Sequence, residues 1–427
     1  MATSLAAKHA KGKKLKDVIF VTSGQAQADA KAIGKENVLN GTVGSILNED
    51  GNLVFLKTVK EAYLNLPDAD YVGYAPIEGI PEFLEAVQNL CFGNYKPEGY
   101  IRDIATAGGT GGVHHLIYNY TDIGDEVLTA DWYWGSYKVM CNDCGRTLVT
   151  YSLFDDENKF NHVDFQAKVN TLCEKQDNIV MIFNTPGNNP TGYSIPEADW
   201  DQILDFLKTK ASSGKNIIIG VDVAYIDYSG DKEAVRKFFN IFGNLPKEML
   251  TVVCYSISKG FTMYGQRVGA MIGVSADKDV ADEFYEINKM TSRATWSNIC
   301  RPAMKTVVNL VANEEKYKAY EAERDQYDVL IHERANIFKE EAEECGLPML
   351  PYHGGFFITI PTDSATEICE ELKKDHIYVI ALANGIRVAA CGIPKRQMKG
   401  LAGKMFEVMK RLGKLWFGFT RIGILIY

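Results

Sequence analysis

Short runs of consecutive apolar residues alternate with amphipathic stretches through the middle of the chain. The runs are rich in β-branched residues, which is typical of strands that are buried on both faces of a parallel sheet. Strands are predicted at residues 126–130, 179–183, 216–222, 250–256 and 268–274. Helical patterns such as residues 196–213 lie between these runs, as in βαβ units. The middle of the chain therefore predicts an α/β domain with a mostly parallel sheet.

The C-terminal third has a different pattern, which predicts a smaller α/β domain. The expected elements are a long charged helix at 312–346, a strand at 354–360, a helix at 365–375, a strand at 387–393 and a helix at 397–413. A chain of 427 residues is long enough for two domains. We expect residues 53–319 to form the large domain, and residues 1–52 with 320–427 to form the small domain and an N-terminal segment.

Charge and hydropathy exclude several classes of function. The formal net charge is −9 and no basic patch stands out, so nucleic acid is not an expected partner. No stretch of about 18 apolar residues exists, and the apolar tail from Leu415 to Tyr427 is too short to span a membrane. The N-terminal lysines lack the apolar segment of a secretory signal, whereas a short amphipathic targeting segment remains compatible with them.

The cysteines indicate a reducing compartment rather than a metal site. Nine cysteines are scattered without regular spacing, which favours free thiols and a cytoplasmic location. Cys141 and Cys144 form a C-x-x-C, but a zinc site would need a second pair, so no metal is expected. We interpret the two as small buried residues near a helix end.

Lys259 is the first candidate for chemistry, in the segment SISKGF after the predicted strand 250–256. Ligand crevices in open α/β sheets lie at the carboxyl ends of the strands. Burial among apolar and aromatic neighbours would lower the pKa of this lysine and free its amine for Schiff-base chemistry. Ser256 and Arg267 flank it and suit a phosphate monoester. A surface lysine beside a solvated arginine is the alternative.

Asp222 and Asn189 follow two other predicted strands. Asp222 ends strand 216–222, where a desolvated carboxylate needs a partner such as a ring nitrogen that becomes protonated. A structural salt bridge or a loop cap would serve equally well. Asn189 lies in NTPGNNPTG, where prolines and glycines form a rigid loop that can present an amide to a ligand.

A glycine-rich segment and an aromatic run complete the candidates. TAGGTGG at 106–112 is expected to be a turn ahead of a helix, and backbone N–H groups there can point at a phosphate. Ordinary turns also use glycine. The run Trp132, Tyr133, Trp134 is more often core, although one ring could stack on a planar cofactor.

Together these motifs resemble a known family. GGTGG, W-G-S-Y-K, NNPTG, D-V-A-Y and S-x-S-K-G-F-x-x-x-G-x-R-x-G occur in an order and at spacings similar to those of class I/II aminotransferases, of the aspartate and aromatic type. The resemblance runs from about Asn40 to the last helix. It implies the pyridoxal-phosphate-dependent transferase fold of type I, in which helices surround the mostly parallel sheet of the large, cofactor-binding domain. The smaller α/β domain would accompany it.

The resemblance also implies a cofactor and an activity. The cofactor would be pyridoxal 5'-phosphate (PLP). The enzyme would move the amino group of an L-amino acid (aspartate, glutamate or aromatic) to a 2-oxo acid in a ping-pong cycle. A β-lyase of the same fold is the alternative, since it would keep Lys259 and Asp222 but need not keep Arg293. A transcription regulator of this fold is rejected, because no helix-turn-helix pattern precedes Gly44.

Roles follow residue by residue from the resemblance. Lys259 would bind the cofactor covalently and act as the base of proton transfer. Asp222 would protonate the ring nitrogen, Tyr225 and Asn189 would hydrogen-bond the ring hydroxyl, and Trp134 would stack on the ring. The expected phosphate cradle consists of Gly109, Thr110, Ser256 and Arg267.

The substrate side follows in the same way. Arg387 would bind the α-carboxylate of the substrate, and Gly44, Asn189 and Trp134 would lie near the substrate. In a homodimer with shared sites, Tyr74 would reach the neighbour's phosphate and Arg293 would bind a side-chain carboxylate. Trp296 and Phe356 are candidate wall residues.

The chain also departs from the family pattern. Tyr137 and Asn184 stand where the family has histidines, so the surroundings of Asp222 are expected to differ. Ile299 and Cys300 replace two prolines after the segment RATWSN that contains Arg293.

Overall fold

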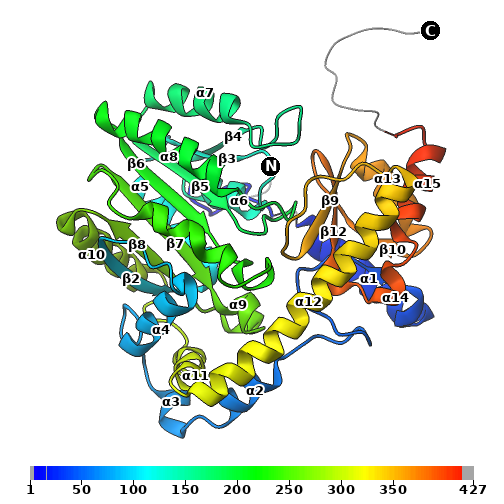
Figure 1. Ribbon diagram of the computed structural model, residues 1–427, viewed down its shortest axis with the longest axis horizontal. Coiled ribbons are helices and arrows are strands. Elements are labelled where there is room, and N and C mark those ends of the chain that lie inside the picture. The colour runs from blue at the N-terminus through cyan, green and yellow to red at the C-terminus, as the bar shows by residue number, and fades with distance from the viewer. Residues whose placement is uncertain (1–3, 16, 416–427) are drawn as a thin grey trace.

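A seven-stranded sheet forms the centre of the computed structural model, which describes residues 4–15 and 17–415 (Figure 1). The strand order is β2-β8-β7-β6-β5-β3-β4, and only β8 runs antiparallel to its neighbours. The strands are β2 (Tyr100–Thr106), β3 (Glu126–Ala130), β4 (Thr147–Tyr151), β5 (Asn178–Asn184), β6 (Asn216–Asp222), β7 (Met249–Ser256) and β8 (Gly269–Ser275).

Five of these strands are the predicted ones, each within one residue at either end. The prediction missed β2 and β4, which pair on one side only and form the edges of the sheet. Edge strands are less covered by neighbours, so their sequences, YIRDIAT and TLVTY, contain polar residues and no continuous apolar run. The apolar-run criterion therefore found only the strands in the interior of the sheet.

Alternate residues of the inner strands face two layers of helices. In β5, Val180 and Ile182 belong to a cluster with α5, α6 and α10, whereas Met181 and Phe183 pack with α7 and α8. The helices of this part are α2 (Lys57–Leu64), α3 (Asp68–Val72), α4 (Pro81–Phe92), α5 (Gly108–Tyr120), α6 (Ser136–Asp143), α7 (His162–Cys173), α8 (Glu197–Ser212), α9 (Ile257–Gly260), α10 (Lys278–Thr295) and α11 (Arg301–Val311).

The glycine-rich segment differs from its prediction as a turn ahead of a helix. Helix α5 begins at Gly108, so the glycines form its first turns. Close packing explains them: a Cβ at Gly112 would lie 3.2 Å from Cys254 Sγ, and one at Gly111 would lie 2.9 Å from the Trp296 ring. Glycine thus lets the start of α5 approach β7 closely.

Two smaller sheets, one of three strands and one of two, lie beside the first part (Figure 1). Strands β9 (Phe357–Pro361), β11 (Ile380–Ala381) and β12 (Gly385–Ala389) are antiparallel, and β1 (Leu39–Asn40) pairs in parallel with β10 (Ile377–Tyr378). They share an apolar cluster around Phe338, Ile358 and Met405 with the helices. These helices are α12 (Glu314–Cys345), α13 (Ala365–Lys373), α14 (Lys395–Met398) and α15 (Leu401–Arg411). Helix α1 (Val18–Ile33) packs through Ala26 in a separate small cluster with Val38 and Tyr378.

Two elements of this part differ from the predicted ones. The last helix is interrupted at Gly400, whose φ of +80° is a left-handed value that suits glycine. The strand predicted at 387–393 ends at Ala389 and continues as a 3₁₀ turn.

The long helix α12 crosses the predicted boundary at residue 320. Tyr320 belongs to the core of the large sheet, whereas Phe338 belongs to that of the small one. The division into 53–319 and the remainder therefore stays a prediction. Within residues 4–15 and 17–415, no helix is long and apolar enough to cross a membrane. Most of the apolar tail, from residue 416 on, lies outside the described residues.

Candidate active site

A cavity of about 360 Å³ lies at the carboxyl ends of β5, β6 and β7. It brings together most of the predicted site residues, which come from segments far apart in the sequence. Those that line it are Gly44, Gly109, Thr110, Trp134, Asn189, Asp222, Tyr225, Ser256, Lys259, Arg267 and Arg387.

Lys259 lies in the short helix α9, directly after β7. Its Nζ donates a hydrogen bond of 2.8 Å to the Gly44 carbonyl and lies 4.8 Å from the centre of the Tyr264 ring. Burial lowers the pKa of this amine to about 8, and the nearby Arg267 and Arg387 guanidinium groups act in the same direction. A neutral, nucleophilic amine is therefore available near neutral pH.

Asp222 ends β6 and is held by a tyrosine. The Tyr137 hydroxyl donates to Asp222 Oδ2 at 2.5 Å, and the Ala224 N–H donates to Oδ1 at 3.2 Å. Burial raises the pKa of Asp222, while the Tyr137 hydrogen bond opposes that change. Burial also raises the pKa of Tyr137 well above 10, and the neighbouring Asp222 charge adds to this effect. Tyr137 therefore remains a protonated, neutral donor.

Asn184 supports the loop rather than the carboxylate. Its Nδ2 donates to the Asp222 carbonyl at 2.9 Å, and its Oδ1 accepts from the Asn189 N–H at 2.6 Å. Asn189 in turn contacts two site residues, since its Nδ2 lies 3.5 Å from the Tyr225 hydroxyl and its Oδ1 accepts from Arg387 Nη1 at 3.2 Å. The rigid loop thus connects Tyr225 with Arg387.

Arg387 lies on β12 with its guanidinium 4.2 Å from the centre of the Phe357 ring. Nη2 donates to the Thr42 carbonyl at 2.7 Å, but the buried Nε has no hydrogen-bond partner among the described residues. Burial lowers the pKa of this guanidinium to about 10. A buried cation with an unused donor suits a carboxylate ligand.

The opposite part of the cavity has the chemistry of a phosphate cradle. It contains the N-terminus of α5, the hydroxyls of Ser256 and Ser258, and Arg267, whose Nη1 lies 3.3 Å from Ser258 Oγ. A Cβ at Gly108 would lie 2.5 Å from Arg267 Nη2, so a side chain there would fill the cradle. Helix N-terminal N–H groups, hydroxyls and a guanidinium are the donors that a phosphate monoester requires.

A family model agrees with this geometry: the model for "Aminotransferase class I and II" matches residues 36–405. The chain belongs to the class I and II aminotransferases. Enzymes of this family depend on PLP, so PLP is the cofactor of this aminotransferase. The cradle, Asp222, Trp134 and the low-pKa amine of Lys259 fit the phosphate, the ring nitrogen, the ring face and the carbonyl of PLP, respectively.

Several known aminotransferases are similar over nearly the whole length. The aspartate aminotransferase of Escherichia coli (strain K12) is 28% identical over 387 residues, which are 87% of this chain and 93% of that protein. The aromatic-amino-acid aminotransferase of the same organism is 25% identical over 393 residues, 88% of this chain and 94% of that one. A crystal structure of an aminotransferase from Anaerococcus prevotii has a TM-score of 0.93 at 37% identity, covering 95% of this chain and 99% of that chain.

Tyr74 and Arg293 do not line the cavity of this aminotransferase. Tyr74 is 89% exposed, and Arg293, in the last turn of α10, donates to Ser297 Oγ at 2.6 Å. Their predicted place is a neighbour's cavity, so their roles stay predictions. The expected wall residues do not line the cavity of this chain. Trp296 stacks on His115 with ring centres 4.3 Å apart, and Phe357 lines the cavity while the centre of the Phe356 ring lies 5.6 Å from Lys259 Nζ, so their wall role stays a prediction.

Sequence reasoning missed several residues of the aminotransferase site. Tyr264 lies beside Lys259, and its hydroxyl accepts a hydrogen bond from the Ile46 N–H at 3.0 Å. Its position in the sequence, five residues after the lysine, could have indicated this proximity. Thr42 contacts Arg387 through its backbone carbonyl, which no side-chain pattern reveals. Asp17 and Phe20, at the start of α1, line the mouth of the cavity. Only the N-cap pattern of Asp17 was visible in the sequence.

Proposed function

We propose that this aminotransferase uses aspartate, glutamate or aromatic L-amino acids as donors and 2-oxo acids as acceptors. The similarity to relatives named aspartate, tyrosine and aromatic-amino-acid aminotransferase supports this substrate class. The observation that carries the proposal is Arg387, a buried guanidinium in the same cavity as the Lys259 amine, whose Nε–H no group of the described residues accepts. Arg387 would bind the α-carboxylate that both substrates share.

We assign the residues around Asp222 to the cofactor. Asp222 would hold a proton on the ring nitrogen, Tyr225 and Asn189 would donate to the ring hydroxyl, and Trp134 would cover the ring. The phosphate would lie among Gly109, Thr110, Ser256 and Arg267. When bound, PLP supplies an electron sink for the charge that develops on the substrate Cα.

Lys259 is the proposed proton carrier. An amine whose pKa is about 8 can take a proton from the substrate Cα and return it without a large free-energy difference between the two states. The Gly44 carbonyl and the rings of Tyr225 and Tyr264 orient this amine. Ile19, Phe20 and Phe357 would restrict water at the cavity mouth.

We further propose a homodimer with shared sites. Tyr74 would donate to the neighbour's phosphate, and Arg293 would bind a side-chain carboxylate of aspartate, glutamate or 2-oxoglutarate. The exposure of Tyr74 supports this assignment, because an 89% exposed tyrosine can be buried by a second subunit. All nine cysteines, which lie in the described residues, are free; this supports a reducing compartment, and we propose the cytoplasm.

The substrate assignment is tested by kcat/KM for aspartate, glutamate, phenylalanine and alanine with 2-oxoglutarate. In Arg293→Leu we expect the dicarboxylic donors alone to lose about 2–4 kcal/mol of transition-state stabilisation. Equal losses for all four donors, or no loss, would reject the role of Arg293. Incubation with a donor alone should convert the bound cofactor to pyridoxamine phosphate. Release of pyruvate and ammonia would instead indicate the β-lyase.

A further inference from the structure

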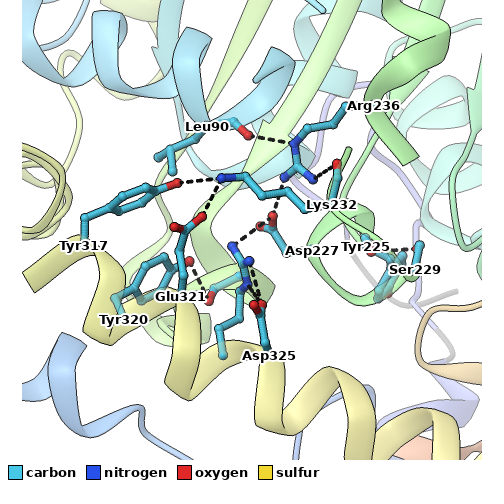
Figure 2. Close-up of polar contacts among 12 residues, drawn as sticks. Leu90, Tyr225, Asp227, Ser229, Lys232, Arg236, Tyr317, Tyr320, Glu321 and Asp325 are labelled. Carbon is cyan, nitrogen blue, oxygen red and sulfur yellow. Dashed lines mark hydrogen bonds and ion pairs between the residues drawn. The ribbon is translucent and has the colours of Figure 1, made fainter. Parts of the chain in front are cut away.

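A second cavity, of about 500 Å³, is lined by three buried charged residues (Figure 2). Asp227 lies in the 3₁₀ turn η2 (Ile226–Tyr228), two residues after Tyr225, and its side chain is 6% exposed. Arg236 lies in η3 (Ala234–Phe242), and Arg324 lies on α12; their side chains are 2% and 3% exposed. We call these three residues the Asp227 cluster.

Two guanidinium groups share the Asp227 carboxylate. Oδ1 accepts from Arg236 Nη2 at 2.6 Å and lies 3.5 Å from Arg324 Nη1. Arg236 also donates to the Leu90 and Lys232 carbonyls, each at 3.1 Å, as Figure 2 shows for Leu90. Arg324 forms its shorter pair with Asp325, at 2.7 Å. The position of the carboxylate is therefore fixed from two sides.

The other oxygen of Asp227 faces the residue that follows Lys259. A Cβ added at Gly260 would lie 2.3 Å from Asp227 Oδ2, whereas its next neighbouring side chain, Tyr320, would be 3.6 Å away. The Tyr320 hydroxyl donates to the Gly260 carbonyl at 3.1 Å, and its ring stacks on Phe261 at 4.6 Å between centres. The carboxylate and Tyr320 thus contact the chain immediately after the reactive lysine.

Stability alone gives no reason for this cluster. Burial of three charges has a large desolvation cost, and well-packed apolar residues in such a place are often as stable or more stable. A carboxylate that two guanidinium groups hold in place, in contrast, limits where the neighbouring Gly260 backbone can lie. We propose that the Asp227 cluster consists of positioning residues that set the place of Lys259 through Gly260.

This inference rests on the proposed role of Lys259. Burial is the largest cause of the lowered pKa of Lys259, and the Arg267 and Arg387 guanidinium groups add to it; neither arginine belongs to the Asp227 cluster. The cluster therefore acts on the location of the amine rather than on its proton affinity. A misplacement of about 1 Å at a reacting group can cost about 100-fold in rate.

A double-mutant cycle with Gly260→Ala and Asp227→Ser tests the contact. Gly260 has no left-handed φ, so the added methyl group meets only Asp227 closely. In the holoenzyme, Gly260→Ala should lower kcat about 10- to 100-fold with little change in KM for the donor. In the Asp227→Ser background, where the obstructing oxygen is gone, the same methyl group should change kcat by less than about threefold. Equal effects in both backgrounds overturn the proposal.

Two further readouts separate position from general stability. Visible circular dichroism of the bound cofactor should weaken in Gly260→Ala and recover in the double variant. In the cofactor-free protein, the pH midpoint of Lys259 acylation should stay unchanged in Asp227→Ser; a shifted midpoint would mean that the cluster acts through charge and would overturn the proposal.

The matched control is Glu321→Gln. Glu321 lies on α12, as Arg324 does, and the substitution removes its 2.5 Å ion pair with Lys232 (Figure 2). Glu321 is not among the side chains nearest to a Cβ at Gly260, which belong to Asp227 and Tyr320. This variant should keep the wild-type kcat and circular dichroism, and a loss equal to that of Gly260→Ala would overturn the proposal. If Asp227→Ser does not fold, the variant with both Asp227→Ser and Arg236→Met takes its place in the cycle, because it removes one positive charge together with the negative one. Borohydride fixation of PLP on a lysine other than Lys259 would reject the proposed role of Lys259, on which this inference rests.

Discussion

At the scale of single residues, the hydrogen bond from the Tyr137 hydroxyl to Asp222 is the feature that most distinguishes this site. A histidine in that place would gain or lose a proton within the working pH range. The phenol does not, because burial holds the pKa of Tyr137 well above 10. The pair therefore has a charge of minus one wherever Asp222 is ionised, and only the carboxylate titrates.

Tyr137→Phe should move the acidic limb of activity to higher pH. The substitution removes the 2.5 Å hydrogen bond that opposes the burial effect on Asp222, so the pKa of the carboxyl rises further. Because the ionised carboxylate is the active form, activity is lost as pH falls through that raised pKa. We expect kcat/KM to fall at least about tenfold, because a hydrogen bond to a charged group contributes about 1.5 kcal/mol or more. The pH profile of kcat/KM measures both effects, and Tyr133→Phe, on the same segment, should leave the profile unchanged.

Lys259 should react as an amine of depressed pKa. Burial lowers its pKa from 10.5 to about 8, so the neutral form predominates above about pH 8 rather than above 10.5. In the cofactor-free protein, acylation of Lys259 followed by peptide mass spectrometry should have its midpoint near pH 8. The exposed Lys60 in the same sample is the internal reference. A Lys259 midpoint above pH 10 would mean that water reaches the amine more freely than its surroundings indicate.

At the scale of elements, the sequence predicted the buried strands well because their patterns are local. β6 and β7 consist largely of apolar residues, and the reactive Asp222 and Lys259 end or follow them. The contacts between distant segments had no such signal. Gly44 with Lys259, Thr42 with Arg387 and Asp227 with Gly260 each depend on backbone atoms or on shape, which residue type does not encode.

Gly269→Ala should disturb the start of α5. A Cβ there would lie 2.4 Å from the Tyr255 carbonyl oxygen and 3.0 Å from the Gly109 nitrogen, so the strand or the cradle must shift. We expect a loss of about 1–3 kcal/mol in the free energy of unfolding, typical of overpacking, and a weaker PLP affinity. Urea denaturation and cofactor titration measure these effects.

The control for this substitution is Gly403→Ala in α15, where no atom of the described residues outside the local helix backbone and the two chain neighbours lies within 4 Å of the added methyl group. It should stabilise the protein by up to about 1 kcal/mol, since alanine favours helix over glycine. If Gly269→Ala is less stable but binds PLP as tightly as the wild type, Gly269 is needed for the fold and not for the phosphate cradle.

At the scale of the whole molecule, the proposed shared sites predict complementation between two variant chains that are each inactive towards aspartate. In a mixture of Lys259→Ala and Arg293→Leu subunits, each heterodimer has one cavity with both residues intact. Random exchange then restores about a quarter of all sites towards aspartate, because half the dimers are mixed and half their sites are complete. Rates after subunit exchange, compared with unmixed variants, measure this fraction. Verified heterodimers without aspartate activity would mean that one chain builds the whole site.

Helix α12 has 32 residues and runs without interruption between the two parts of the molecule (Figure 1). At 1.5 Å per residue the helix is about 48 Å long, so a tilt of about 5° at one end displaces the other by about 4 Å. Tyr320, near one end, contacts the backbone after Lys259, while Arg334, farther along, donates to the Leu47 and Cys391 carbonyls beside the Arg387 side of the cavity. Helix α12 therefore links the backbone after Lys259 with the backbone near Arg387, and we expect a kink in the middle of α12 to change the distance between the Lys259 amine and the Arg387 guanidinium.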